Sequence, residues 1–176
     1  MGGLLVIGAV IFSGLLWGDL SSKYILISLF CLISFGLIGF VDDYKKIQEK
    51  NSNGISSQTK LFYQFIAASV ISIALFSTAS SQAEYSYIVP FFKDVLLNFG
   101  FWFIFISIFI LVGSSNAVNL TDGLDGLATV PVMLVAACFA FISYVSGNII
   151  FAEYLLIPYI EGVGDVAIFC LSLIHI

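Results

Sequence analysis

The chain has 176 residues, of which 60% are hydrophobic and 10% are charged, and its formal net charge is −5. Soluble globular domains carry about 25% charged residues, so this composition excludes a soluble enzyme and predicts an integral membrane protein. The six cationic side chains are all lysines and form no basic patch of the kind that binds a nucleic-acid backbone. We therefore expect no nucleic-acid partner.

Five long stretches without charged residues or histidine predict membrane-spanning helices. They cover residues 1–18, 24–41, 61–83, 95–121 and 126–152. Crossing the hydrocarbon core takes roughly 20 apolar residues, and a sixth stretch at 166–174 is too short to cross unaided. Because the stretches lack the strict alternation of a barrel strand, the sequence predicts an all-α integral membrane protein. We expect a polytopic bundle with about five complete transmembrane helices and the start of a sixth.

Both ends of the sequence suggest a fragment. Residues 1–3 run directly into an apolar stretch, without the positively charged region of a signal peptide. Residues 170–176 leave a helix unfinished. His175 stands one residue from the end and receives no catalytic role. Three cysteines lie in apolar stretches and lack metal-ligand spacing: Cys31, Cys138 and Cys170.

Lysine placement predicts the topology, because cytoplasmic loops are enriched in Lys and Arg. The segment 42–60 holds four of the six lysines and is therefore predicted to be cytoplasmic. Counting helices from it places 19–23, 84–94 and 153–165 outside, and returns the turn at 122–125 to the inside. This threading brings most of the polar groups at helix ends to one membrane face: Asp42, Asp43, Lys60, Asn116, Asn119, Asp122 and Asp125.

Two adjacent acids, Asp42 and Asp43, stand where the second apolar stretch ends. Plain solvation accounts for acids at a helix exit, and so does a role in keeping the helix from sliding into the membrane. The functional alternative is a metal ligand plus a general base, because adjacent carboxylates suit Mg²⁺ and proton abstraction. Both acids are therefore candidates for catalysis and for contact with Mg²⁺.

The segment 113–128 is far too polar for an ordinary turn between two apolar helices. Four polar side chains recur every three residues and would share one face of a helix: Asn116, Asn119, Asp122 and Asp125. Gly123 and Gly126 would allow the backbone to bend or to approach a ligand closely. Since ionisable groups at membrane depth are costly and usually line a site or a pathway, this segment favours a functional interpretation.

Lysines follow the paired acids. For Lys45, Lys46 and Lys50 we favour snorkelling, in which the ammonium reaches the headgroups. Lys60 begins the next apolar stretch and shares a predicted face with four carboxylates. Acids with Mg²⁺ and a nearby lysine bind phosphates and stabilise the charge that moves in phosphoryl transfer. The residues thus indicate a metal-assisted reaction of a phosphate at the cytoplasmic surface, with a lipid as one substrate; an ion or proton pathway is the alternative.

These motifs resemble the polyprenyl-phosphate N-acetylhexosamine-1-phosphate transferase family, and within it the branch that acts in bacterial peptidoglycan synthesis. The resemblance is carried by residues 1–3, by 39–44 and most specifically by 115–128, with support from 89–94 and 157–159. It implies a multi-pass protein of the bacterial inner membrane, with its active site on the cytoplasmic face and Mg²⁺ as cofactor.

The resemblance also implies a reaction. The phosphate of undecaprenyl phosphate attacks the sugar-linked phosphate of UDP-N-acetylmuramoyl-pentapeptide, UMP leaves, and lipid I remains in the membrane. A sister transferase that moves N-acetylglucosamine-1-phosphate to a polyprenyl phosphate is the alternative. The oligomeric state, including a homodimer, stays open.

Site roles follow from the matching positions. The resemblance makes Asp42 and Asp43 the paired acids beside the reacting phosphates, with Asp42 activating the lipid phosphate, and it places Lys60 on the nucleotide diphosphate. In the second motif, the resemblance makes Asp122 a catalytic acid and makes Asn116 and Asn119 substrate contacts. It assigns the uridine pocket to Gly123, Leu124 and Asp125. The family's main Mg²⁺-ligating Asp and its His-rich loop lie beyond this sequence, so we expect the fragment itself to be inactive. The sequence departs from the family from Leu171 onward, so the resemblance implies that 1–170 is part of one transmembrane domain and that 171–176 is a non-native tail.

Overall fold

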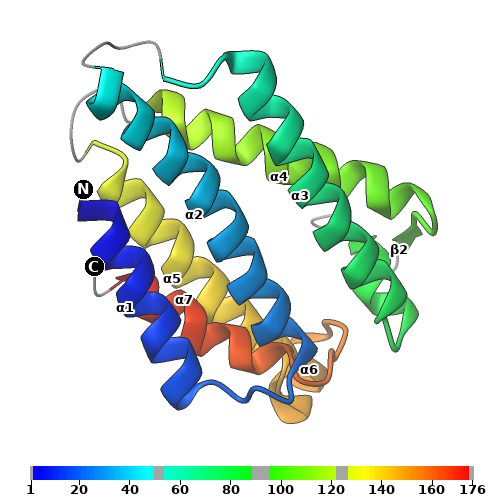
Figure 1. Ribbon diagram of the computed structural model, residues 1–176. Helices are drawn as coiled ribbons and strands as arrows, with labels where there is room; N and C mark the ends of the chain where they lie inside the picture. Colours follow the sequence, from blue (N-terminus) through cyan, green and yellow to red (C-terminus); the bar gives the residue numbers. More distant parts are fainter. Residues whose placement is uncertain (1, 50–53, 89–95, 122–126, 175–176) are drawn as a thin grey trace.

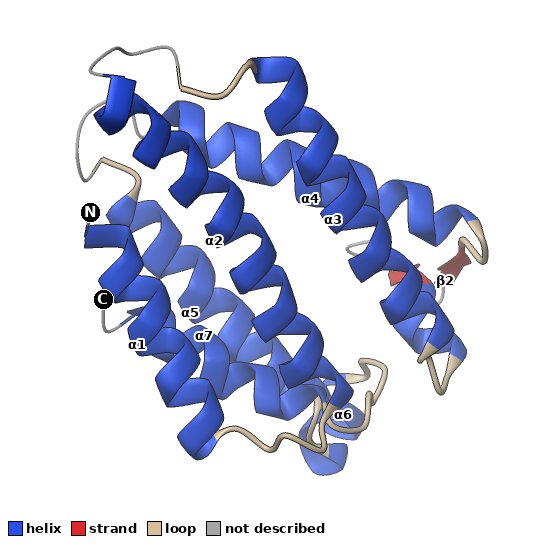
Figure 2. Cartoon of the chain, in the orientation of Figure 1, coloured by secondary structure: helices blue, strands red, loops and turns tan. Residues whose placement is uncertain are grey.

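A computed structural model of the protein describes residues 2–49, 54–88, 96–121 and 127–174. Its helices are α1 Gly2–Trp17, α2 Lys23–Glu49, α3 Ser57–Ser77, α4 Trp102–Thr121, α5 Thr129–Ser146, α6 Ile149–Leu155 and α7 Val166–Ile174. The other elements are the 3-10 turns η1 Gln82–Tyr85 and η2 Val163–Asp165, and the strands β1 Ser86–Ile88 and β2 Leu96–Asn98. The strands pair antiparallel with Tyr87 opposite Leu97, and Figure 2 shows how small they are beside the helices.

Helices that could cross a membrane make up most of the described chain. Four of them, α2 to α5, are long and apolar enough to span. Large apolar side chains such as Phe62 and Phe109 are exposed on their surfaces, as expected where lipid, not water, surrounds the helices. The all-α polytopic class is thus confirmed. By length the described residues give four complete spans instead of five, because α1 has 16 residues.

Two predicted spans are interrupted, and local side chains explain where. The stretch 95–121 begins with β2, and Asn98 accepts a hydrogen bond from the Gly100 backbone in a turn, so α4 starts only at Trp102. The stretch 126–152 breaks at Gly147, where α5 ends against the backbone of Gly164 too closely for a Cβ atom. Asn148 then caps α6 by accepting from two backbone N–H groups.

α2 lies between two groups of helices (Figure 1). On one side α1, α5 and α7 pack together, with a small buried cluster of Ala140, Ala167 and Cys170 between α5 and α7. On the other side α3 packs against both α2 and α4. The C-terminal ends of α2 and α4 and the N-terminal ends of α3 and α5 gather at one end of the bundle. The described members of the polar group that the sequence assigned to one membrane face lie on helix ends that gather there: Asp42, Asp43, Lys60, Asn116 and Asn119.

A charged clasp joins α2 and α3 at the opposite end. Lys23 Nζ lies 2.7 Å from Glu84 Oε2 and donates to the Thr78 carbonyl at 2.6 Å. The Tyr24 hydroxyl donates to the same Glu84 oxygen at 2.6 Å. Burial alone would raise the pKa of Glu84, but the hydrogen bonds from Lys23 and Tyr24 hold it below its ordinary value. The clasp fixes how α2 and α3 lie along each other.

Replacing Glu84 with Gln is expected to lower the melting temperature of the complete protein in detergent by several degrees at pH 7. Hydrogen bonds to a charged group contribute about 1.5–3 kcal/mol each, and the change leaves Lys23 without its carboxylate. A lowered carboxyl pKa stabilises the fold above the unfolded-state value of about 4.3. The gap between wild type and variant should therefore shrink as the pH falls below that value. Glu153→Gln, at an exposed site on α6, is the control. An equal fall in its melting temperature would contradict a stabilising role for the contacts of Glu84 with Lys23 and Tyr24.

Candidate active site

Asp42 is the centre of a polar cluster near the C-terminal end of α2. The residue is only 6% exposed, although it carries a carboxylate. Its Oδ2 lies 2.7 Å from Lys46 Nζ and 3.7 Å from Lys60 Nζ. A buried charge is tolerated only where it is paired and hydrogen-bonded, and here two cations surround one carboxylate.

The backbone beyond α2 completes this cluster. Gly54 has a φ of +53°, and a Cβ atom there would overlap Asp42 Oδ1, so only glycine fits. The turn lets the Ile55 N–H donate to Asp42 Oδ1 at 2.8 Å. Ser56 then caps α3 by accepting from the Thr59 N–H, and this start of the helix places Lys60 in its first turn, facing Asp42.

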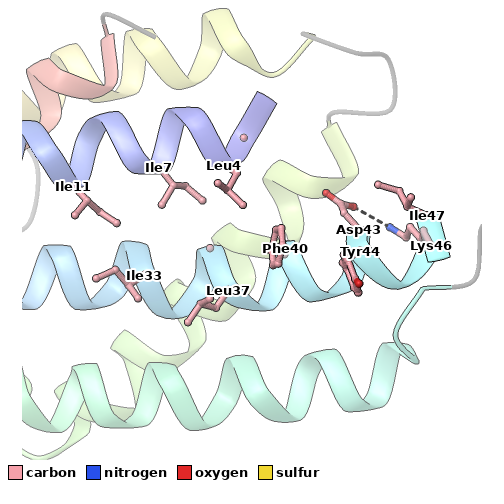
Figure 3. Close-up of a pocket in the computed structure, with 13 residues that line it drawn as sticks. Leu4, Ile7, Ile11, Ile33, Leu37, Phe40, Asp43, Tyr44, Lys46 and Ile47 are labelled. Carbon is pink, nitrogen blue, oxygen red and sulfur yellow. Dashed lines mark ion pairs between the residues drawn. The ribbon is translucent and has the colours of Figure 1, made fainter. Parts of the chain in front are cut away.

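The two adjacent acids have different surroundings. The Asp43 side chain is 76% exposed, against 9% for Asp42. Its Oδ1 lies 3.6 Å from Lys46 Nζ, the pair marked in Figure 3. Consecutive residues of a helix point in directions about 100° apart, so one acid is enclosed by cations while the other is open to a ligand.

An apolar groove of 660 Å³ lies between α1 and α2. Figure 3 shows Ile7, Ile11 and Ile33 along its length. Asp43 and Lys46 stand at the end nearest the polar cluster. The groove thus joins a long apolar surface to a pair of charged groups.

A second polar group links α3 to α4. Gln64 lies one turn after Lys60 on α3 and is 2% exposed. The Asn116 Nδ2 atom donates to Gln64 Oε1 at 2.8 Å and to the Val112 carbonyl at 2.8 Å. Gln64 Nε2 donates in turn to Ser115 Oγ at 3.3 Å. The structure therefore brings Asn116 next to the helix that carries Lys60.

The remaining candidates divide between exposed and undescribed positions. Asn119 lies one turn beyond Asn116 near the end of α4 and is exposed. Four lie outside the described residues: Asp122, Gly123, Leu124 and Asp125. Helix α7 continues through Ile174, and the proposed domain boundary at 170 stays a prediction.

Sequence reasoning missed two members of the site. Lys46 was assigned to snorkelling, but its ammonium instead contacts both acids; the four-residue spacing from Asp42 was the available signal. Gln64 was passed over inside an apolar stretch. The available signal was an amide side chain four residues after Lys60, in a stretch otherwise rich in apolar residues.

Few carboxylate oxygens of the described cluster are free to bind Mg²⁺. Such ions bind in proteins through one or two carboxylates, with phosphate oxygens and water completing the shell. Both Asp42 oxygens already interact with a cation or an N–H group, whereas the exposed Asp43 carboxylate is accessible. In the part of the chain that the structure describes, no three His, Cys, Asp or Glu side chains gather to hold a metal. Among the described carboxylates of this cluster, Asp43 is therefore the one with room to hold Mg²⁺.

Comparisons with known proteins identify the family of the chain. The model of glycosyl transferase family 4 matches residues 25–174. A curated relative, the phospho-N-acetylmuramoyl-pentapeptide-transferase of Pelagibacter ubique (strain HTCC1062), is 56% identical over 174 residues. The alignment covers 99% of this chain and 48% of the relative, so the chain spans about half of that protein's length.

Proposed function

Because the chain belongs to glycosyl transferase family 4, we propose that the complete protein makes lipid I. It transfers phospho-N-acetylmuramoyl-pentapeptide from its UDP conjugate to undecaprenyl phosphate and releases UMP. The observation that carries this proposal is the 56% identity, over nearly the whole chain, to a relative named for that reaction. The multi-pass helical fold supports it, since one substrate is a membrane lipid.

The lysines around Asp42 suit the binding of phosphates. Lys60 Nζ is 3.7 Å from Asp42, beyond a short hydrogen bond, and its side chain is 18% exposed. The ammonium can therefore donate to the diphosphate of the nucleotide while the carboxylate holds it in place. Charge-assisted hydrogen bonds of this kind are stronger than neutral ones, and they stabilise the negative charge that gathers on the departing UMP.

The two acids receive different roles. Asp43 is open at the end of the groove, and it is the carboxylate that would hold Mg²⁺ beside the reacting phosphates. Bound Mg²⁺ neutralises phosphate charge. Asp42 orients Lys46 and Lys60, and removal of a proton from the lipid phosphate by Asp42 stays a prediction. The apolar groove that ends at Asp43 and Lys46 supports a lipid phosphate as the second substrate.

The protein is a multi-pass membrane protein, and we assign its site to the cytoplasmic face of the bacterial inner membrane. The support is the grouping of lysines at the end of the bundle where Asp42 lies, since cytoplasmic loops are enriched in Lys and Arg. Lys45, Lys46 and Lys60 all lie there. A nucleotide-linked substrate made in the cytoplasm reaches this face without crossing the membrane.

The complete protein in detergent is expected to release UMP from UDP-N-acetylmuramoyl-pentapeptide only when undecaprenyl phosphate and Mg²⁺ are both present. Chelation with EDTA should reduce the release to background, and added Mg²⁺ should restore it. UDP-N-acetylglucosamine is the matched control substrate, and we expect no UMP from it. Release from that sugar alone would identify the sister transferase, and ion flux across vesicles without UMP would contradict both transferase assignments.

A further inference from the structure

Gln64 is buried next to the site, yet the proposed reaction assigns it no role. It lies on α3 four residues after Lys60, so the two side chains occupy neighbouring turns of one helix face. An amide buried without partners is costly, but both polar atoms of Gln64 are engaged: Oε1 by Asn116 and Nε2 by Ser115. Its polar atoms therefore serve the contact between α3 and α4.

The hydrogen bonds decide which way the Asn116 amide points. A backbone carbonyl can only accept, so the Asn116 nitrogen must face Val112 O, at 2.8 Å. The amide nitrogen has two hydrogens, and the second is directed to Gln64 Oε1 at 2.8 Å. With both hydrogens used, Asn116 presents only its carbonyl oxygen to any further group. Among the described residues no donor reaches that Oδ1 atom.

We propose that Gln64 is a positioning residue that fixes Asn116 as a hydrogen-bond acceptor for the nucleotide-sugar substrate. The matching group on the substrate is a donor, either a sugar hydroxyl or the ring N–H of the uracil. An oxygen acceptor repels phosphate, so the phosphates belong to Lys60 and the donor groups to Asn116. This inference rests on the proposed function and adds that Lys60 on α3 and Asn116 on α4 bind different groups of the same substrate.

Gln64→Met tests this in the complete protein, because methionine keeps the approximate shape and removes both hydrogen bonds. The KM for UDP-N-acetylmuramoyl-pentapeptide should rise about tenfold, the size expected for one neutral hydrogen bond. The KM for undecaprenyl phosphate should stay unchanged. Ser72→Ala is the matched control: Ser72 is buried on the same helix, and its hydroxyl has no hydrogen-bond partner among the described residues. Both KM values should stay unchanged in that variant.

A double-mutant cycle separates positioning from packing. If Gln64 acts through Asn116, the Gln64→Met change should add nothing to the KM of an Asn116→Ala variant. Additive effects, or an equal rise in the KM of both substrates, would overturn the proposal. Gln64→Glu keeps an oxygen for Asn116 and covers the case in which Gln64→Met does not fold. Its KM for the nucleotide sugar should stay within about threefold of wild type, and a tenfold rise would overturn the proposal.

These outcomes differ from a failure of the proposed function. Wild-type protein that releases no UMP from UDP-N-acetylmuramoyl-pentapeptide contradicts the reaction itself. Wild-type protein that is active, with Gln64→Met folded and an unchanged KM for that substrate, contradicts only the role of Gln64. Melting temperatures in detergent establish which variants are folded.

Discussion

Replacing Asp42 with Asn in the complete protein is expected to reduce kcat for UMP release by a factor of about 10²–10³, the range seen when one preorganised electrostatic group is removed from an active site. The variant side chain keeps an oxygen for the Ile55 N–H, which Asp42 Oδ1 accepts at 2.8 Å. It loses the charge that holds Lys46 at 2.7 Å and Lys60 at 3.7 Å. Geometry near the reacting phosphates is therefore lost while the backbone turn is retained.

Nucleotide binding should change far less than turnover in this variant, because Lys60 keeps its own charge. Titration of the UDP substrate into the purified protein measures binding, and UMP release at saturating substrates measures turnover. Asp19→Asn is the control, since this exposed acid accepts from the Ser21 N–H at 2.9 Å, far along the chain from the cluster. Equal losses in binding and turnover would show that Asp42 acts in binding or folding, and would remove it from the chemical step.

Replacing Lys60 with Met is expected to weaken binding of the UDP substrate by about 10-fold to 100-fold, because hydrogen bonds to charged groups contribute about 1.5–3 kcal/mol. The side chain is 18% exposed and flanks the Asp42 carboxylate. Methionine keeps an unbranched apolar stem but cannot donate to the diphosphate. The measurement is the KM and the Kd of the UDP substrate at fixed ionic strength.

Lys45→Met is the matched control for this variant, because it removes the same charge from the same end of the bundle. The Lys45 side chain is 46% exposed and forms a 3.7 Å ion pair with Glu49, and exposed pairs contribute about 0–1 kcal/mol. Its effect on binding should be small and should disappear at high salt. Equal weakening in both variants would indicate general attraction of an anion, and would exclude a specific contact from Lys60.

Asp42 and Asp43 show where sequence reasoning reached its limit. Their adjacency at the end of an apolar stretch was enough to mark a candidate site, and the lysine-rich segment after them pointed to the same end of the bundle. The sequence did not distinguish the enclosed Asp42 from the exposed Asp43, because adjacent carboxylates are equally candidates for catalysis and for contact with Mg²⁺. The difference arises because α3 and the Gly54 turn cover one side of α2 and leave the other open.

The polar contacts between helices were harder still to predict. In a membrane helix the lipid-facing and protein-facing sides are both apolar. Hydropathy therefore predicts the length of a span but not which side packs against other helices. Gln64 was missed for this reason, since its partners Ser115 and Asn116 come from α4. The contact of Lys46 with Asp42 lies within α2, and its four-residue spacing was available in the sequence. The break at Gly147 was missed because glycine there is required by contact with Gly164, 17 positions along the chain.

The sequence by itself determined the membrane class, the approximate spans, the family and the end of the bundle where most of the lysines lie. Each follows from composition or from short motifs, which are local properties of the chain. The tertiary structure decided which acid is buried between two lysines, which amide faces Asn116, and that α1 and α2 enclose an apolar groove. Those features depend on distances between helices that are far apart in sequence, and only packing brings them together.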